Sequence, residues 1–521
     1  MDDERPADDL GETARVLRLA VPRGEYWWGG DTADGYRMPL TDGYRADLRQ
    51  PGDNQAMPLL ISSAGRYLWS DIPFTIEFSG SVLTLEPYGD GRIEAGSGDA
   101  SLRGGYLAAA RHFAPSAMRP ADVMFTAPQY NLWIEMPFRP TQRGVQGYAD
   151  QVLENGFPPG VLAIDDMWSE SYGAWRFDAA RFPDPQGMTT RLHELGFTVM
   201  LWVVPLITPD TGTFRSLAKR RLLVADAAGE PAIGRWWNGY SAAIDMLNPD
   251  GAAWLEAEFH RLRAETGVDG FKFDGGDVSF YQSMDLEGPE RYTAAWNALA
   301  ARFAVNELRA SWLAAGLPLV QRQRDKAHSW DEKDGLASLI PNGLAQGLTG
   351  HAFTCPDMIA GGEYQRFPAG GERASLDPEL FVRSAQCQSL FPMMQFSAAP
   401  WRLLDRSHLG LCLEAALLHS AHGAEIVRLA DAAARTGEPI QRHMSYVFPD
   451  QGYERVRDQF MLGDDLMVAP VVVKGQERRA VLVPPGSWIA DDGTHLEGPR
   501  EAEVEAPLGR LPRFRRCPTK W

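Results

Sequence analysis

The chain begins with short apolar runs that alternate with polar residues and turns. Segments rich in glycine, proline and other turn residues separate the runs, which lie at residues 58–63, 66–69, 74–78 and 81–85. Short alternating runs bounded by turns predict antiparallel strands. We therefore expect an N-terminal β-sandwich over residues 1–121.

A second pattern begins near residue 122, where strand-like apolar runs alternate with segments of helical period. The strand-like runs lie at residues 123–128, 160–166, 197–205, 270–274, 317–323 and 350–354. The helical segments lie at residues 145–155, 187–195, 251–266, 292–315 and 336–348. Repeated strand–helix units over about 300 residues predict an α/β fold, a (β/α)8 TIM barrel, over residues 122–436. Short strands return after residue 437, which predicts a C-terminal β domain over residues 437–521.

Charge and composition restrict the class of partner. The 521 residues include 51 Lys and Arg against 69 Asp and Glu, a net charge of −18, which disfavours binding to nucleic acids or anionic membranes. The acidic start lacks the basic, apolar pattern of a signal peptide, no apolar stretch is long enough to span a membrane, and four scattered cysteines suggest no disulfide framework. We therefore expect a cytoplasmic protein with a neutral ligand; association with further copies of the chain stays open.

Carboxylates follow three of the strand-like runs, at the positions where barrel enzymes carry their chemistry. Asp274 ends residues 270–274, and two glycines after it allow the backbone to approach a ligand closely. Asp165 and Asp166 end another run, and strand alternation predicts that one points into a pocket and the other away. Asp325 follows a third run. A helix cap or a structural ion pair is the alternative role for each.

Two such carboxylates beside tryptophan side chains are typical of a glycosidase, in which one is the nucleophile and the other the acid/base. The 16 tryptophans favour a sugar site because sugar rings stack on aromatic faces, although tryptophan also fills ordinary cores. We expect five of them at the barrel mouth: Trp133, Trp168, Trp202, Trp236 and Trp237. The ten histidines show no ligand spacing such as HxxxH, so we expect no catalytic metal and no cofactor.

Several motifs, in order along nearly the whole chain, resemble those of glycoside hydrolase family 31, the retaining α-glycosidases. They are Pro58-Leu-Leu-Ile-Ser-Ser, Ala163-Ile-Asp-Asp-Met-Trp, Lys272-Phe-Asp-Gly-Gly-Asp, Asp334-Gly-Leu-Ala-Ser, Pro356-Asp-Met-Ile-Ala-Gly-Gly and Phe460-Met-Leu-Gly-Asp-Asp. Each motif alone is weak, and their common order is specific.

The resemblance implies roles for individual residues. Asp274 matches the family nucleophile, and counting back from Asp334 places the acid/base at Asp325, with Asp331 and Asp334 as alternatives. Arg322 and Arg324 would lower the pKa of Asp325, so we expect them to point towards substrate hydroxyls or other carboxylates. The residues expected to bind substrate are Trp133, Asp165, Asp166, Trp202, Arg235, Trp236, Asn238, Lys272, Arg322, Asp357, Gln395 and Trp401.

One departure from the glucose-type members bears on the substrate. Where they carry an arginine and a sugar-binding histidine, this chain has Gln395 and Ser397, a pattern similar to the α-galactosidase-type branch of the family. The resemblance therefore implies an α-galactosidase acting on a glycoside or oligosaccharide. A glucoside, a xyloside or a sulfoquinovoside is the alternative substrate. A non-catalytic sugar-binding protein is a further alternative, and a metal-dependent hydrolase fits poorly because no histidine accompanies the carboxylates.

Overall fold

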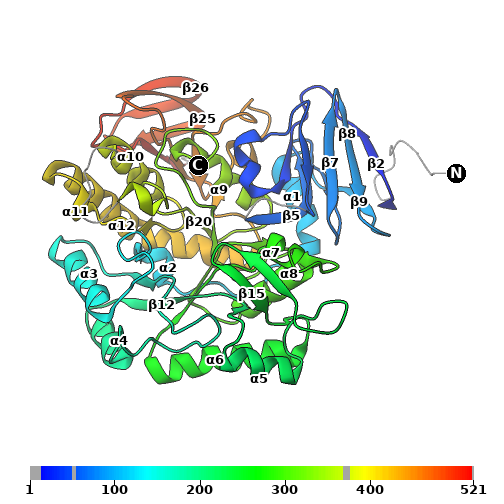
Figure 1. Cartoon of the computed structure of the whole chain (residues 1–521). Coiled ribbons are helices and arrows are strands. Elements are labelled where there is room, and N and C mark those ends of the chain that lie inside the picture. Colours follow the sequence, from blue (N-terminus) through cyan, green and yellow to red (C-terminus); the bar gives the residue numbers. More distant parts are fainter. Residues whose placement is uncertain (1–12, 50–53, 368–375, 519–521) are drawn as a thin grey trace.

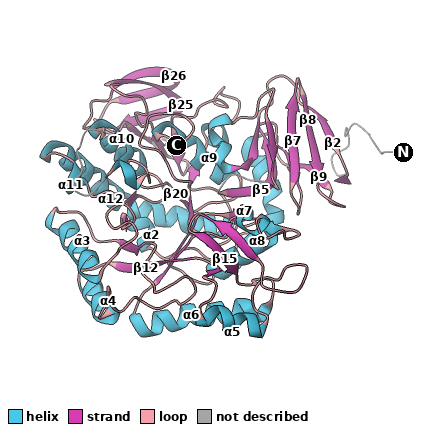
Figure 2. Ribbon diagram, in the orientation of Figure 1, coloured by secondary structure: helices cyan, strands magenta, loops and turns pink. Residues whose placement is uncertain are grey.

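Three groups of strands make up the molecule (Figure 1). The computed structural model describes residues 13–49, 54–367 and 376–518. The N-terminal sheets, in blue, lie at the right, the barrel lies at the lower left, and the C-terminal sheet, in red, lies at the top. Figure 2 shows the helices arranged around the barrel strands.

The N-terminal part is a sandwich of two sheets. One sheet has the order β1 (Thr13–Ala14), β9 (Ile93–Ser97), β6 (Arg66–Trp69), β5 (Gln55–Ser62) and β18 (Ser311–Trp312), with β3 (Trp27–Asp31) also on β5. The other has the order β2 (Leu17–Ala20), β8 (Val82–Pro87), β7 (Phe74–Ser79) and β4 (Arg45–Asp47). Leu83 and Leu85 of one sheet share a core with Leu60 and Leu68 of the other, and β8 buries alternate residues as period-2 patterning requires. The predicted sandwich is confirmed.

Eight parallel strands form the central barrel. Their order is β20 (Thr354–Cys355), β19 (Gln321–Arg322), β17 (Asn306–Leu308), β16 (Gly270–Phe273), β12 (Thr198–Val203), β11 (Val161–Ile164), β10 (Gln129–Asn131) and β21 (Gln395–Phe396). The two ends of this order meet where the backbone nitrogen of Ile359, just after β20, donates to the carbonyl of Gln395 at 2.8 Å. The predicted TIM barrel is confirmed.

Helices follow most barrel strands and pack around them (Figure 2). The longer ones are α3 (Gln142–Glu154), α4 (Pro185–Glu194), α6 (Pro249–Thr266), α8 (Pro289–Ala300), α9 (Leu339–Leu348), α10 (Pro378–Gln388) and α12 (Arg406–Thr436). Between β12 and β16 the chain inserts α5 (Gly212–Arg220) and a small antiparallel sheet of β13 (Leu206–Ile207), β15 (Gly239–Ala243) and β14 (Ile233–Trp236). The short helices are η1 (Thr32–Arg37), α1 (Leu102–Ala109), η2 (Ala110–Phe113), α2 (Val123–Thr126), α7 (Val278–Gln282), η3 (Leu336–Ser338), η4 (Tyr364–Arg366), α11 (Pro400–Leu403) and α13 (Met444–Val447).

Two predicted elements differ in the structure. Residues 123–126 form the short helix α2, which packs against α12, and the barrel strand β10 begins after Pro128. The helix predicted over 292–315 ends at Ala300, and β17 and β18 follow it. The side chain of Asn306 donates to the carbonyls of Phe303 and Pro318, which fixes β17 in the barrel. This pairing outweighs the helical preference of the alanine-rich segment.

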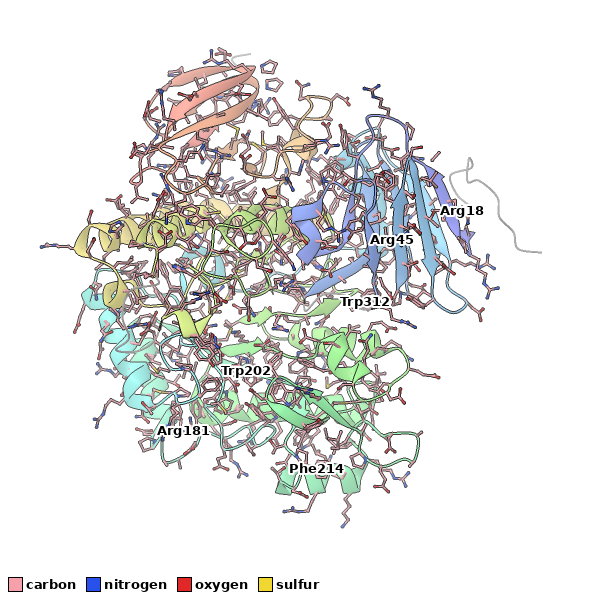
Figure 3. All side chains as sticks on the ribbon, turned by 45° about the horizontal axis from the view of Figure 1, so that its top comes forward. Arg18, Arg45, Arg181, Trp202, Phe214 and Trp312 are labelled. Carbon is pink, nitrogen blue, oxygen red and sulfur yellow. The ribbon has the colours of Figure 1, made fainter. Side chains whose placement is uncertain are left out.

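The chain departs from regular barrel topology after β17. Instead of a helix, β18 leaves the barrel and pairs in parallel with β5, so that Ser311 faces Gln55 and Trp312 faces Ala56. Figure 3 places Trp312 beside the N-terminal sheets and Trp202 within the barrel. The two parts therefore share a sheet, and the predicted division at residue 121 stays a prediction.

The C-terminal sheet has six strands, and its buried residues divide between a core of its own and a core shared with the barrel. The strand order is β22 (Gln441–Arg442), β23 (Phe460–Leu462), β24 (Leu466–Val468), β27 (Arg513–Arg516), β25 (Arg478–Ala490) and β26 (His495–Glu505). Trp488 and Phe514 are buried in the sheet's own core with Val481 and Met467. The predicted C-terminal β domain is confirmed as an element, while its boundary at residue 437 stays a prediction.

Candidate active site

A pocket of about 380 Å³ opens at the carboxyl ends of the barrel strands. Its size lies within the range typical of small-ligand sites. Four acidic and three basic side chains lie among its lining residues. The lining consists of Trp133, Phe138, Asp165, Asp166, Trp202, Trp237, Asn238, Lys272, Asp274, Arg309, Arg322, Asp325 and Met358.

Asp274 follows β16 directly and is held from several sides. The indole nitrogen of Trp202 donates to its Oδ2 at 2.7 Å, and Arg309 Nε lies 3.7 Å from its Oδ1. Burial raises the pKa of Asp274, but Lys272, Arg309 and Arg322 together with the Trp202 hydrogen bond outweigh it, so the pKa is lowered. Asp274 is therefore an ionised carboxylate at neutral pH.

The two glycines after Asp274 are required by the backbone and by packing. Gly275 and Gly276 have φ values of +60° and +70°, in the left-handed region that favours glycine. A Cβ at Gly276 would lie 2.5 Å from Cδ1 of Trp296. The glycines thus allow the chain to turn directly after Asp274, and the predicted close approach of this backbone to a ligand stays a prediction.

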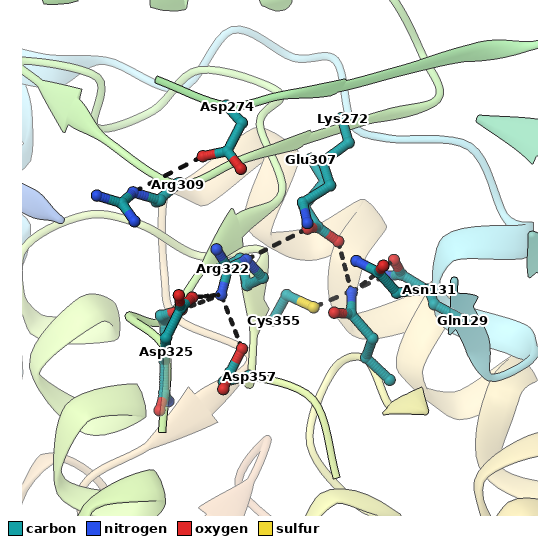
Figure 4. A network of polar contacts seen from close by, with 12 residues as sticks. Gln129, Asn131, Lys272, Asp274, Glu307, Arg309, Arg322, Asp325, Cys355 and Asp357 are labelled. Atoms are coloured by element: carbon teal, nitrogen blue, oxygen red, sulfur yellow. Dashed lines mark hydrogen bonds and ion pairs between the residues drawn. The ribbon is translucent and has the colours of Figure 1, made fainter. Parts of the chain in front are cut away.

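Arg322, a lining residue of the pocket, is the centre of a network of charges (Figure 4). Its Nη1 lies 2.7 Å from Asp325 Oδ1 and 2.7 Å from Asp357 Oδ1, and its Nε lies 3.4 Å from Glu307 Oε1. Arg322 is 2% exposed, whereas the side chain of Asp325 is 57% exposed. The prediction that Arg322 points towards other carboxylates is confirmed for Asp357 and Glu307, but Arg322 contacts Asp325 as well, which the prediction did not include.

The network shifts the pKa values of Asp325 and Asp357 in opposite directions. Loss of hydration inside the pocket acts to raise the pKa of Asp325, but the positive charges of Arg322, Arg309 and Lys272 outweigh it and hold this pKa below its ordinary value. Burial and the charge of Asp325 raise the pKa of Asp357. Arg324 behaves as expected, since its Nε lies 3.5 Å from Asp334, another carboxylate.

Asp165 and Asp166 both line the pocket, which corrects the expectation that one of them points away. The strand β11 ends at Ile164, and Met167 has φ +67°, so strand alternation no longer applies. Lys272 Nζ donates to Asp165 Oδ2 at 2.7 Å. Burial lowers the pKa of Lys272, but the charge of Asp165 outweighs this, and the pKa is raised.

Asp166 is bound by neutral donors instead of a cation. Asn238 donates to its Oδ2 at 2.8 Å, Tyr172 donates to its Oδ1 at 3.1 Å, and the backbone nitrogen of Met167 donates to its Oδ1 at 2.6 Å. Burial and the neighbouring charge of Asp165 raise the pKa of Asp166 to about 7. This carboxyl group therefore changes charge near neutral pH.

Several residues expected to bind substrate lie outside the pocket lining. Gln395 is buried beneath the floor and donates to Glu307 at 2.7 Å, and Asp357 is buried on Arg322. Trp236 is 5% exposed and packs on Tyr172, while Arg235 is exposed on the other side of β14. Alternation along β14 explains this pair: the inward residue fills the core of the insertion and the outward one faces solvent.

Trp401, which is expected to bind substrate, also lies outside the pocket lining. Its indole nitrogen donates to Gln151 of α3 at 2.8 Å, and its ring packs against Tyr148 and Phe157. This side chain therefore packs α11 against α3 on the outside of the barrel. Trp168, expected at the mouth, is buried and donates to the carbonyl of Trp202 at 2.7 Å.

The sequence reasoning missed Arg309, Phe138 and Met358 in the lining and Glu307 beneath it. Arg309 and Glu307 fall in the segment predicted as a helix, and the polar Asn-Glu pair at residues 306–307 gave no signal of a strand, because both residue types are depleted in strands. Arg309 Nη2 lies 3.0 Å from Asp277 Oδ1, which explains why Asp277 faces inward.

Asp331, an alternative acid/base, lies in an exposed turn. Its Oδ1 accepts hydrogen bonds from the backbone nitrogens of Lys333 and Asp334 at 2.9 and 2.8 Å. Among the residues that the structure describes, no group of three or more His, Cys, Asp or Glu side chains is placed to hold a metal ion. Nor does any helix within those ranges have the length and apolarity needed to cross a membrane.

A parallel barrel with paired carboxylates and aromatic side chains at its mouth defines the architecture of the barrel glycoside hydrolases. Residues 125–405 match the family model of the glycosyl hydrolases family 31 TIM-barrel domain, and residues 437–518 match that of the glycosyl hydrolase family 31 C-terminal domain. The chain belongs to glycosyl hydrolase family 31.

Individual relatives agree with this assignment. Myogenesis-regulating glycosidase of Mus musculus is 32% identical over 393 residues, covering 74% of this chain and 55% of that protein. Sulfoquinovosidase of Escherichia coli is 22% identical over 382 residues, covering 68% of this chain and 54% of that protein. The chain thus spans about half the length of the curated relatives it matches. Among solved structures, a Flavobacterium johnsoniae GH31 dextranase complexed with glucose shares the fold with a TM-score of 0.85, at 19% identity over 96% of this chain and 66% of that chain.

Proposed function

We propose that the chain is a retaining α-glycoside hydrolase in which Asp274 is the nucleophile and Asp325 the acid/base. The observation that supports this most is that both carboxylates line one pocket. They follow β16 and β19, which are separated in the barrel by β17 alone. Asp331 is not among the residues that line this pocket, which favours Asp325 over that alternative.

The proposed reaction has two displacements. Asp274 attacks the anomeric carbon and forms a glycosyl ester, while the bond to the leaving oxygen breaks and that oxygen takes a proton from Asp325. Asp325 then accepts a proton from water, the water oxygen attacks the anomeric carbon, and the ester bond to Asp274 breaks. Ionised Asp274 suits the first attack, since a carboxylate is the nucleophilic form.

The contact between Arg322 and Asp325 affects the two displacements in opposite ways. Because Arg322 favours the ionised form of Asp325, it disfavours proton donation in the first step and favours the base role in the second. We therefore expect formation of the glycosyl ester to limit the rate for leaving groups that need a proton.

The charges of the pocket support a neutral sugar. Each basic side chain in the lining already contacts a carboxylate: Lys272 contacts Asp165, Arg309 contacts Asp277, and Arg322 contacts Asp325. An anionic sugar such as a sulfoquinovoside would have to compete with these carboxylates for a cation. The proposed substrate is an α-galactoside, and Gln395 and Ser397 support it only through the resemblance to that branch, because Gln395 lies beneath the floor. A neutral glucoside or xyloside is the second candidate.

A panel of 4-nitrophenyl α-glycosides tests the proposal. We expect hydrolysis of the galactoside, with the α-anomer of the sugar as the first product in the NMR spectrum and no activity in Asp274→Asn. A first product of β configuration would refute the retaining mechanism. Sugar binding without turnover by the wild-type protein would instead favour a sugar-binding protein of the same fold.

A further inference from the structure

Three aromatic side chains form a cluster at one side of the pocket mouth. We call Trp133, Phe138 and Tyr364 the aromatic cluster. Their ring centroids lie 5.5, 5.4 and 5.3 Å apart for the pairs Trp133–Phe138, Trp133–Tyr364 and Phe138–Tyr364, with interplanar angles of 76°, 81° and 87°. Such edge-to-face contacts are favourable and fix the rings relative to one another.

Phe138 is the outermost member, and two properties of this residue act against the stability of the unliganded protein. Its side chain is 41% exposed although it is large and apolar, and it lines the pocket. Its φ of +64° lies in the left-handed region, which bulky residues other than glycine rarely adopt. An exposed ring held on a strained backbone at a pocket is typical of a ligand contact.

The aromatic cluster is attached to the Asp325 side of the pocket. The indole nitrogen of Trp133 donates to the carbonyl of Gly362 at 3.2 Å. A Cβ built on Gly362 would lie 3.7 Å from Cβ of Asp325, so this glycine is packed beside the proposed acid/base. The backbone nitrogen of Trp133 donates to the side chain of Asn131 at 2.9 Å, which fixes the start of the loop.

Barrel topology places Trp237, the other exposed aromatic residue in the lining, on the opposite side. The loops after β10 and β20, which carry the aromatic cluster, lie on the two sides of β21. Trp237 belongs to the insertion between β12 and β16, and β16 is four strands from β21 around the ring of eight. The aromatic cluster therefore lies across the mouth from Asp274, which follows β16.

We propose that Phe138, supported by Trp133 and Tyr364, binds the leaving group of the substrate. A leaving group departs towards the residue that protonates its oxygen, and the aromatic cluster is on that side. Its apolar faces suit a flat ring, which is either an aromatic ring or the C–H face of a second sugar. The proposal rests on the proposed function and deepens it: the substrate class is the α-glycosides whose leaving group contains a ring.

Leaving groups with and without a ring test this inference. The glycosyl fluoride has no ring to contact Phe138, whereas the phenyl α-glycoside and an α-linked disaccharide do. All three carry the same sugar, chosen as the one whose fluoride the wild type hydrolyses fastest among galactosyl, glucosyl and xylosyl fluoride. The variant is Phe138→Asn, because asparagine tolerates the left-handed conformation and should keep the loop intact. Phe138→Tyr keeps the ring, and Leu417→Ala removes a comparably exposed apolar side chain from α12.

We expect kcat/KM of Phe138→Asn to fall about tenfold on the phenyl glycoside, the disaccharide or both, and to change less than about twofold on the fluoride. A fall on the phenyl glycoside alone identifies an aromatic leaving group, and a fall on the disaccharide identifies a second sugar. Leu417→Ala should behave as the wild type, Phe138→Tyr should keep more activity on the ring-containing substrates than Phe138→Asn does, and the melting temperature of Phe138→Asn should not fall.

Two results would overturn the inference while leaving the proposed function intact. One is an equal loss on all three substrates, which would mean that Phe138 acts on the shared sugar or on the fold. The other is no loss on either ring-containing substrate. If the wild type hydrolyses none of the fluorides, the proposed function fails and the leaving-group site fails with it.

Discussion

Replacing Asp166 by asparagine should stabilise the protein increasingly as the pH rises. Asp166 is 5% exposed, and burial beside Asp165 raises its pKa from 3.8 to about 7. In the unfolded chain the group has its ordinary pKa, so folding favours its protonated form. The stability gained from this preference is present below the unfolded value and is lost as the pH rises through the folded value. Asparagine does not ionise and avoids this loss.

The size of the effect follows from the shift. A difference of about three pKa units corresponds to about 4 kcal/mol between the fully protonated and the fully ionised group. Part of the loss has already occurred at pH 5, since the unfolded group is ionised there. Between pH 5 and pH 8 the free energy of unfolding of Asp166→Asn should therefore rise by about 2–3 kcal/mol relative to the wild type.

Urea unfolding followed by tryptophan fluorescence at pH 5, 6.5 and 8 measures this difference. Asp331→Asn is the control, because hydrogen bonds from Ser329 and from backbone nitrogens outweigh the effect of burial and lower the pKa of Asp331. Asp331 is ionised in both the folded and the unfolded state over this pH range. The difference in free energy of unfolding between Asp331→Asn and the wild type should therefore stay constant. A difference for Asp166→Asn that is the same at pH 5 and pH 8, or that shrinks, would refute the reasoning.

Three further predictions concern the reaction. Asp274→Asn should lose nearly all turnover while its melting temperature stays near that of the wild type. In the wild type, mass spectrometry after treatment with a fluoro-sugar trap should find the label on Asp274. A label on Asp165 or Asp166 would contradict the assignment. Asp325→Ala should lose about 10²–10⁴-fold in kcat/KM on substrates with poor leaving groups but little on the fluoride, and azide should yield a glycosyl azide of retained α configuration; this pattern in Asp331→Ala instead would move the acid/base. Trp401→Phe should leave KM unchanged, because Trp401 packs against α3 outside the pocket; a raised KM would return it to the substrate site.

The period of the apolar residues was sufficient to predict the three groups of strands. Strands such as β12 and β16 are apolar at almost every position, which distinguishes them from the helices between them. β17 was missed because the segment after α8 is rich in alanine and its strand is set by partners distant in sequence. Local preference contains no information about such pairing.

The candidate site was predictable where it depends on strand ends. Asp274 and Asp165 follow apolar strands directly, and parallel strands bring their ends together at one edge. Arg309 was not predictable, because its position depends on β17. Trp401 and Gln395 lie in motifs resembling those of the family, yet one packs outside the barrel and the other beneath the pocket floor. A sequence motif predicts that a residue lies near the site. Only the direction of its side chain shows whether the residue lines the pocket or packs against residues that do.

The pairing of β18 with β5 makes the barrel dependent on a part of the chain that precedes it by more than two hundred residues. Gln55 of β5 donates to the carbonyl of Arg322 at 2.7 Å, and its carbonyl oxygen atom Oε1 accepts from Gln346 of α9 at 2.9 Å. A slip of β5 by one residue would carry Gln55 about 3.3 Å along the strand and turn it to the other face of the sheet. A recombinant barrel that begins at residue 122 would lack the hydrogen bond from Gln55 to Arg322, the arginine that contacts Asp325. For protein engineers, the barrel therefore cannot be separated from the sandwich that precedes it, and exchange of N-terminal sheets between relatives must preserve the register at Gln55.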